Sequence, residues 1–242
     1  MCGKIYLNVP FAEKDAAKKL GARWDASLKK WYYKGEVSNY VKFARWITEG
    51  REQTAIAHEH IYIVEGTRKC FRCGKKTKII GLGIGEHTVL YEDEDGSFVS
   101  ETEEDLVGYE PLHLAWAYDE SDVPPALLRY IKQKYNVHMG FSRIAGECFA
   151  NHCDHCGVIQ GNWELFHEDS PLTVYIPDGF ALRRKLKQLK IYSIGIDENL
   201  VLDWEFGYGD NDGVYFKHCK VEELILPPSE DEYISYADMY KE

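Results

Sequence analysis

The 242-residue sequence lacks the patterns that mark membrane-spanning, secreted and most well-defined catalytic proteins. No apolar run approaches the roughly 20 residues of a membrane span, and the N-terminus has no apolar segment of the kind that a secretion signal needs. It contains no Gly-x-x-x-x-Gly-Lys phosphate loop and no nucleophile elbow. The glycine-rich run at 81–85 lacks the acid and the helix of a dinucleotide-binding fingerprint. An enzyme is therefore the less favoured class, although a scattered catalytic site would leave no such pattern.

Positive charge is absent from residues 79–128, which contain 13 Asp and Glu and no Lys or Arg. The first 50 residues show the opposite bias, with ten basic and five acidic side chains. Since the whole chain has a formal net charge of −11, the head has a charge of +5 and the remainder −16. Such an asymmetry concerns partners rather than fold. It predicts nucleic acid as a partner of the head, and a basic protein as a possible partner of the acidic surface.

Two matched cysteine motifs occur, Cys70-Phe-Arg-Cys73-Gly74 and Cys153-Asp-His-Cys156-Gly157, with 79 residues between them. Each motif places two thiolates on one tight turn, and the glycine permits the positive φ that such a turn often needs. Two such turns complete a tetrahedral four-cysteine site, so we predict one structural Zn²⁺ bound by Cys70, Cys73, Cys153 and Cys156. A closed site of this kind leaves no position open for chemistry. The alternatives are two unrelated pairs in a reduced core or, less favoured, a redox dithiol.

Three cysteines lie outside these motifs, at positions 2, 148 and 219. We interpret all three as inert. Seven cysteines, four of them in metal-type pairs, are more typical of a reducing cytoplasm than of a disulfide scaffold. The sequence therefore predicts a cytoplasmic protein.

Residues 1–50 have the pattern of a compact basic head. A short alternating strand at 4–9 ends at a proline, and strong helix formers follow at 12–20 before Gly21. Two short strands around 23–24 and 30–33 come next, and apolar residues at helical spacing occupy 37–48. The predicted order is β-α-β-β-α.

The run from Leu7 to Asp25, Leu-Asn-Val-Pro-Phe-Ala-Glu-Lys-Asp-Ala-Ala-Lys-Lys-Leu-Gly-Ala-Arg-Trp-Asp, is followed by Lys30-Trp-Tyr. These residues resemble a small bacterial domain of unknown function that occurs attached to plasmid-type primases and to nuclease-like proteins. The resemblance covers about residues 4–45. No primase or nuclease motif accompanies it, so it implies a nucleic-acid context and no reaction.

The rest of the chain predicts an α+β protein in which the basic head precedes a strand-rich body built on an expanded zinc ribbon over 58–167. The predicted domains are 1–50 and 58–242, joined by a linker at 49–57, with an acidic insertion at 79–128. Within the body the sequence predicts strands at 60–69 and 76–84 and a hairpin at 87–100. It also predicts an irregular stretch at 101–123, a helix after 122, strands at 141–150 and 158–166, a basic amphipathic helix at 179–189, and strands at 191–206 and 213–226.

Cations alternate with aromatic residues in the head, as they do on surfaces that bind single-stranded nucleic acid. The aromatic residues are Trp24, Trp31, Tyr32 and Tyr33. The predicted phosphate-binding residues are Arg23, Lys29, Lys30 and Lys34. The alternative is that both tryptophans fill the core of a small domain, which needs every large side chain it has.

The first functional hypothesis is thus a zinc-stabilised, non-enzymatic module associated with nucleic acid through its head. The second is a protein-interaction protein, such as an adaptor, an inhibitor or an immunity-type partner, that acts through its acidic surface. The third is an enzyme with a scattered site.

Overall fold

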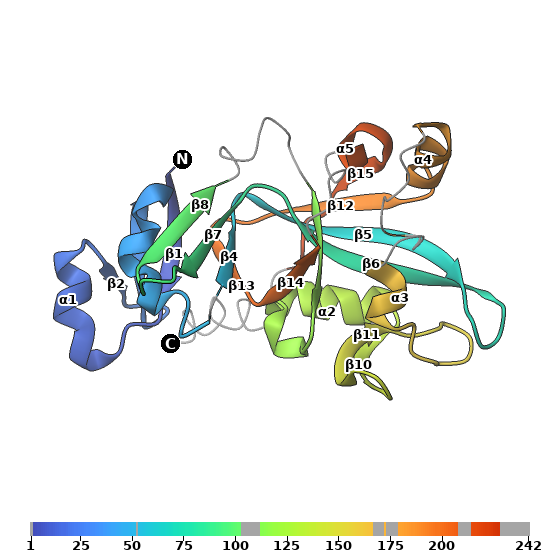
Figure 1. The fold of residues 1–242 in the computed structure, drawn as a ribbon, viewed down its shortest axis with the longest axis horizontal. Coiled ribbons are helices and arrows are strands. Elements are labelled where there is room, and N and C mark those ends of the chain that lie inside the picture. The colour runs from blue at the N-terminus through green and yellow to red at the C-terminus, as the bar shows by residue number, and fades with distance from the viewer. Residues whose placement is uncertain are drawn as a thin grey trace, which may run out of the picture.

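The computed structural model describes residues 2–51, 53–102, 112–166, 172, 179–207 and 214–227. Over these residues the protein is α+β and rich in strands, as the sequence predicts. The strands form four sheets of three, six, four and two strands. Figure 1 shows the three-stranded sheet of the head at one end of the molecule and the six-stranded sheet in the body.

The head contains a three-stranded antiparallel sheet in the order β1-β3-β2. Its elements are, in chain order, β1 (Cys2–Leu7), η1 (Phe11–Glu13), α1 (Lys14–Lys19), β2 (Arg23–Asp25), β3 (Lys30–Glu36) and the 3₁₀ segment η2 (Val37–Trp46). Helix α1 ends before Gly21, whose φ of 101° is a conformation that glycine adopts without strain. The predicted order of elements is confirmed, although the last helix is 3₁₀ rather than α.

The six-stranded sheet of the body has the order β14-β9-β6-β5-β12-β15. Its strands are β5 (His60–Lys69), β6 (Lys76–Ile84), β9 (His113–Ala117), β12 (Lys190–Gly195), β14 (Trp204–Gly207) and β15 (Lys220–Glu223). All neighbours are antiparallel except β12 and β15, which are parallel. The hairpin of β5 and β6 is therefore the centre of the sheet.

Both faces of this sheet are covered (Figure 1). Ile61 and Ile63 of β5 face a core shared with α2 (Pro125–Lys134) and the two-stranded hairpin of β10 (Val137–Ser142) and β11 (Gly146–Asn151). Tyr62 and Val64 face a second core, which includes residues of α3 (Asn162–Phe166), α4 (Gly179–Leu186) and α5 (Val214–His218). Because side chains alternate along a strand, a strand covered on both faces is apolar almost throughout.

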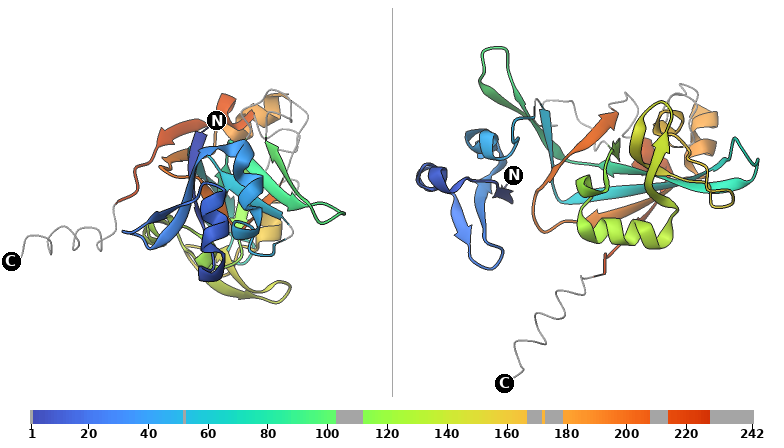
Figure 2. Two further views of the ribbon diagram at one scale, coloured as in Figure 1. Left: turned by 90° about the vertical axis from the view of Figure 1, so that its left-hand side faces the viewer. Right: turned by 90° about the horizontal axis from the view of Figure 1, so that it is seen from below.

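The four-stranded sheet joins the body to the head. It has the order β13-β4-β7-β8, formed by β4 (Gln53–Ala57), β7 (His87–Glu92), β8 (Phe98–Thr102) and β13 (Leu200–Leu202). The chain passes from β4 to β5 at Glu59, whose φ is 56°, and the neighbouring passage from β6 to β7 is tied to it by a hydrogen bond from His58 N–H to the carbonyl of Glu86. Figure 2 shows the hairpin of β7 and β8 projecting from the molecule.

Several predicted elements of the body differ from the structure. Residues 53–57, expected in a linker, form β4, and part of the stretch expected to be irregular forms β9. Helix α3 occupies 162–166, where a strand was predicted, and α5 precedes the short β15 in the predicted strand at 213–226. In each case partners distant in sequence override local propensity. The hairpin at 87–100 is confirmed, with Gly96 in its turn at φ 81°.

The acidic segment 79–128 contributes β6, β7, β8 and β9 to the two large sheets. Its described acidic residues lie in turns, near strand ends and in the short 3₁₀ helix η4 (Glu120–Asp122), and those at 92–95 are all exposed. The acidic residues at 103–110 lie outside the described residues.

Candidate metal centre and cationic face of the head

The two cysteine motifs fold into turns of the same local structure. In the first turn, which joins β5 to β6, Gly74 N–H donates to the carbonyl of Cys70, and Cys70 N–H donates to the carbonyl of Lys75, each at 2.9 Å. The second turn has the same two hydrogen bonds. Gly157 N–H donates to the carbonyl of Cys153, and Cys153 N–H donates to the carbonyl of Val158, each at 2.9 Å. Gly74 and Gly157 have φ angles of 70° and 68°, a left-handed conformation that glycine adopts without strain.

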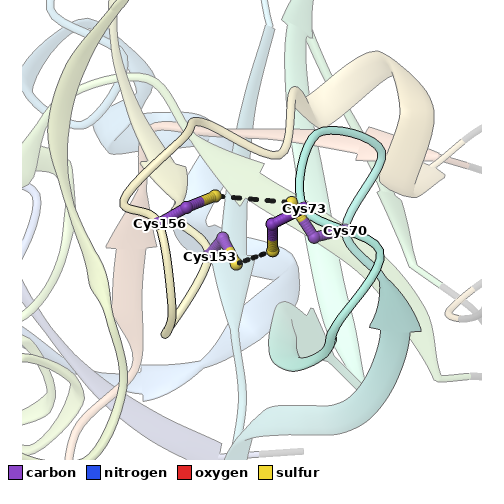
Figure 3. A group of neighbouring side chains, drawn as sticks. All are labelled: Cys70, Cys73, Cys153 and Cys156. Carbon is purple, nitrogen blue, oxygen red and sulfur yellow. Dashed lines mark hydrogen bonds between the residues drawn. The ribbon is translucent and has the colours of Figure 1, made fainter.

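These turns meet with all four thiols in one cluster (Figure 3). The Sγ atoms of Cys70 and Cys156 are 3.7 Å apart, as are those of Cys73 and Cys153, and all four lie within 4.8 Å of one another. A sulfur–sulfur disulfide bond would be about 2.0 Å. A tetrahedron of sulfur atoms about 2.3 Å from a central Zn²⁺ has edges of about 3.8 Å. The four cysteines can therefore hold one metal ion, and they are the only such group of His, Cys, Asp or Glu in the part of the chain that the structure describes.

Backbone amides tune the thiols of this cluster. Burial by itself raises the pKa of Cys70, but the N–H groups of Cys73 and Arg72 and the neighbouring thiols lower it to about 6. The pKa of Cys153 is also lowered, because the N–H groups of His155 and Cys156 outweigh its desolvation. For Cys156 the N–H of Val158 lowers the pKa, but desolvation and the other three thiols raise it to about 11. Oriented N–H groups stabilise thiolates, which are the form that binds a metal.

Hydrogen bonds hold the second turn against β6. The Oδ2 of Asp154 accepts from Thr77 Oγ1 at 3.0 Å and from Lys78 N–H at 2.9 Å, while Thr77 Oγ1 accepts from Asp154 N–H at 2.9 Å. The side chain of His155 lies 2.9 Å from the carbonyl of Lys76 through its Nε2. The second turn is therefore attached to β6 by hydrogen bonds as well as by any metal that the four cysteines hold.

A buried amide continues this connection. Asn151, at the end of β11, accepts from Ile80 N–H at 2.8 Å through Oδ1 and donates to the carbonyl of Ile80 at 2.9 Å through Nδ2. Gln160 Nε2 lies 3.6 Å from the Sγ of Cys70 and His155 N–H lies 3.4 Å from the Sγ of Cys153, as donors around a metal–thiolate site do. Sequence reasoning missed Thr77, Asn151 and Gln160, because no local pattern marks a residue that pairs across 70 or more positions.

The remaining described cysteines lie outside the cluster. Burial raises the pKa of Cys148, and it raises the pKa of Cys219 to about 12. A thiol with a raised pKa is a poor nucleophile at neutral pH. The interpretation of these two residues as inert agrees with their surroundings.

Three of the four predicted phosphate-binding cations lie on one face of the head sheet. Arg23 of β2 is directly opposite Tyr32 of β3, and Lys30 and Lys34 lie two positions to either side of Tyr32 on the same strand. Since residues i and i+2 of a strand share a face, these side chains point the same way. Lys29 lies in the turn between β2 and β3 at φ 52°, and all four cations are exposed.

The tryptophans lie on the opposite face, against α1 and η2. Trp31 is 8% exposed and belongs to the head core, while Trp24 is 50% exposed and meets it edge-on with ring centroids 5.4 Å apart. The prediction that the cations and the tryptophans share one surface is therefore wrong. Side chains alternate along the strands, so Tyr32 lies beside the cations, while Trp24, Trp31 and Tyr33 lie on the core side. The core interpretation is confirmed for Trp31 and holds in part for Trp24.

The head packs on the body through an apolar core and a polar contact. Its core includes Ile56 of β4 and Leu90 of β7, both fully buried. At the free edge of β1, Asn199 N–H donates to the carbonyl of Lys4 at 2.8 Å, and the Lys4 ammonium lies 2.6 Å from Glu198. The head and the four-stranded sheet thus form one continuous core.

Residues 4–48 match the model of a family described as "Domain of unknown function (DUF5710)". The chain is also similar to two curated proteins of Escherichia coli, both named DNA primase TraC. One is 34% identical over 86 residues, which are 36% of this chain and 8% of the relative; the other is 49% identical over 41 residues, which are 17% of this chain and 3% of the relative. The resemblance of the head to a small domain linked to plasmid-type primases is thereby confirmed.

The matches cover less than a tenth of the length of these curated relatives. No solved structure gives a significant match to the chain. Among the helices of the described residues, none combines the length and the apolar composition of a membrane span.

Proposed function

We propose that this protein is a zinc-stabilised, non-enzymatic module whose basic head, residues 1–50, associates with single-stranded nucleic acid while the body, 58–242, supports it. The observation that carries the proposal is the exposed cationic face of a head domain whose relatives include proteins named DNA primase. The part of the chain that the structure describes contains no ion-pair partner for Arg23, Lys30 or Lys34. Cations left without a carboxylate are available to phosphates.

Zinc is the metal that we propose for the four-cysteine cluster. A tetrahedral set of four thiolates suits Zn²⁺ or iron, and a closed four-coordinate site stabilises a fold rather than carrying out chemistry. Cys70, Cys73, Cys153 and Cys156 would be its ligands. Such a site, with free thiols elsewhere, also suits the reducing cytoplasm that we propose as its location.

Elemental analysis of protein purified without added metal tests this assignment. We expect about one zinc per chain and no iron. A colourless protein with about one zinc that is lost on treatment with a strong chelator would support the site. Iron in place of zinc, or no metal in reduced protein, would overturn it.

Binding of a labelled single-stranded oligonucleotide to the full chain tests the nucleic-acid role. For three or four phosphate contacts, the logarithm of the association constant should fall with the logarithm of salt concentration with a slope of about −2 to −3. Reversing two cations in Lys30→Glu/Lys34→Glu should weaken binding at low salt by about tenfold or more and reduce the slope by about 1.4.

The matched control is Arg183→Glu/Arg184→Glu on α4, which makes the same change of net charge at two exposed cations of the body. It should leave binding nearly unchanged. Equal loss in both double variants would mean that net charge alone attracts the oligonucleotide. No binding by the full chain at tens of micromolar protein and low salt would end the nucleic-acid proposal.

The second candidate function, a protein-interaction protein, is favoured by the acidic turn of the projecting hairpin. Asp93, Glu94 and Asp95 are all exposed there, and the described residues include no ion pair with any of them. The side chain of Asp93 accepts from the N–H of Glu94, and that of Asp95 accepts from Ser97, so these hydrogen bonds are local to the turn. Pull-down with the wild-type chain and with an Asp93→Asn/Glu94→Gln/Asp95→Asn variant tests it: a basic protein captured only by the wild type would support this role.

A further inference from the structure

We infer that the head binds single-stranded nucleic acid by stacking a base on Tyr32, with Arg23, Lys30 and Lys34 holding the phosphates around it. This inference rests on the proposed function and adds the position of the ligand. It assigns the contact with the bases to a tyrosine on the solvent side of the sheet, and excludes both tryptophans from it.

Tyr32 is at the centre of the solvent face of the head. Strand β3 is the middle strand, and register places Tyr6 of β1 directly opposite Tyr32 on one side and Arg23 of β2 directly opposite on the other. The rings of Tyr6 and Tyr32 meet edge-on, with centroids 6.3 Å apart. The Lys4 ammonium lies over one side of the Tyr32 ring, 5.0 Å from its centroid, so the other flat side of this partly exposed ring is the one that we assign to a base.

The neighbouring positions on β3 are cationic. Lys30 and Lys34 lie on the same face as Tyr32, and their Cα atoms are roughly 13–14 Å apart along an extended strand. Each is exposed, and Arg23 is a third exposed cation beside Tyr32, in addition to Lys4, whose ammonium lies over the ring. An exposed aromatic ring surrounded by cations is the arrangement by which proteins bind single strands without reading sequence, because every base has a flat face.

Acidic groups lie at the margins of this face and limit where the strand can run. Glu198 of the body pairs with Lys4 at 2.6 Å and lies 3.2 Å from the hydroxyl of Tyr6. Asp25 lies opposite Lys30 and accepts from the Tyr6 hydroxyl at 3.1 Å, and Glu36 is at the end of β3. Because carboxylates repel phosphates, the strand should cross Tyr32 between Arg23 and Lys34 rather than over Tyr6.

The opposite face offers no comparable site. Trp24 is half exposed, but one side of it packs on Trp31, and the core of the head and α1 cover that side of the sheet. The cations that the sequence places next to Trp24 and Trp31 point away from them. Of the two faces of the head sheet, the face of Tyr32 is the one on which Arg23, Lys30 and Lys34 lie beside a partly exposed ring.

The test compares two oligonucleotides of equal length, oligothymidylate and an abasic strand with the same phosphates. The full wild-type chain should bind the thymidylate strand about fivefold or more tightly than the abasic strand, because stacking adds about 1–3 kcal/mol per base. In Tyr32→Leu this preference should disappear, while the salt dependence remains. Tyr32→Phe, which keeps the ring, should retain the preference, and Phe11→Leu, which removes another exposed ring beside a lysine, should not affect it.

A second measurement does not depend on any variant. A strand that carries 5-iodouracil should, on irradiation, crosslink to the peptide that contains Tyr32, identified by mass spectrometry of the wild-type chain. Crosslinking at Trp24, or a Tyr32→Leu chain that still prefers bases over the abasic strand, would overturn the inference and leave the proposed function in place. Equal binding of both strands by the wild type would do the same. No binding of either strand would overturn both.

Discussion

The metal centre and the solvent face of the head use polar side chains in opposite ways. At the metal centre, the buried side chains of Thr77 and Asn151 form their hydrogen bonds within the protein, and the exposed Asp154 is one of the partners of Thr77. On the solvent face, Arg23 and Lys34 have no carboxylate partner among the described residues. A buried polar group has to be paired inside the protein, whereas an exposed cation is satisfied by water. The first arrangement therefore stabilises the fold, and the second leaves charge available to a ligand.

This difference predicts that substitutions in the two regions affect different properties, stability at the metal centre and nucleic-acid affinity on the solvent face. Changes at the metal centre should lower stability, with effects on binding that follow from unfolding. Changes on the solvent face should lower affinity for nucleic acid and leave stability almost unchanged.

Cys153→Ser should have the largest effect. Removing a ligand from a structural zinc site loses binding free energy that is also folding free energy, so the stability of the body should fall by several kcal/mol or more, on the order of the metal contribution itself. The measurement is thermal unfolding followed by circular dichroism, with metal content determined on the same sample. Cys219→Ser, at a thiol outside the cluster, is the control and should keep its metal. A Cys153→Ser chain with unchanged metal and melting temperature would contradict the site.

Asp154→Ala should destabilise the protein by about 1–3 kcal/mol. It removes the acceptor of the Thr77 hydroxyl and the Lys78 N–H, and one of these donors is partly buried. Urea unfolding of the metal-loaded chain would measure it. Glu94→Ala, at an exposed carboxylate in the turn between β7 and β8, is the control and should change stability by less than about 0.5 kcal/mol. Equal effects of the two substitutions would show that the turns are held by the metal alone.

Acid should loosen the head through Asp25. Hydrogen bonds from the Ser27 hydroxyl and then the Leu28 N–H lower the pKa of this carboxyl to about 2. A carboxyl whose pKa is lower in the folded state contributes stability above its unfolded pKa of about 3.9, and this contribution is lost as the pH falls toward 2. Hydrogen exchange of head amides between pH 4 and 2 should show this loss, and Asp25→Asn should not show it. Identical pH profiles for the two chains would contradict the assignment.

Glu198→Gln should have the smallest effect. The pair with Lys4 is partly solvent-exposed, with side-chain exposures of 24% and 32%, so its loss should cost between 0 and about 1 kcal/mol. The variant should also bind an oligonucleotide slightly more tightly, by no more than about fivefold, because a carboxylate leaves the margin of the cationic face. Weaker binding than the wild type would show that Glu198 positions Lys4 for the ligand.

The metal cluster and the order of elements in the head were predictable from the sequence because both are encoded locally. Cys70 and Cys73 lie within one turn whatever the rest of the chain does, and Gly74 allows that turn. The order of side chains from Lys30 to Lys34 also contains information about the faces of the strand. Applied strictly, the two-residue period separates Trp31 and Tyr33 from Tyr32 and the lysines, and this would have predicted the two faces of the head.

Helix α3 and strand β9 could not be predicted in this way. Their apolar patterns suit either a helix or a strand, and the contacts in the folded protein decide between them. Leu165 belongs to the core that contains Tyr62 and Val64, and β9 pairs with both β6 and β14. Short apolar segments have little intrinsic preference, so tertiary contacts decide.

Local sequence was enough to show which residues could bind a metal and that the head is basic, because spacing and charge are properties of neighbouring residues. The pairing of Asp154 with Thr77, the contact of Glu198 with Lys4 and the position of Arg23 directly opposite Tyr32 follow from the tertiary structure alone. These facts depend on register and on contacts between distant segments. Such contacts form only when the whole core packs, and no local pattern records them.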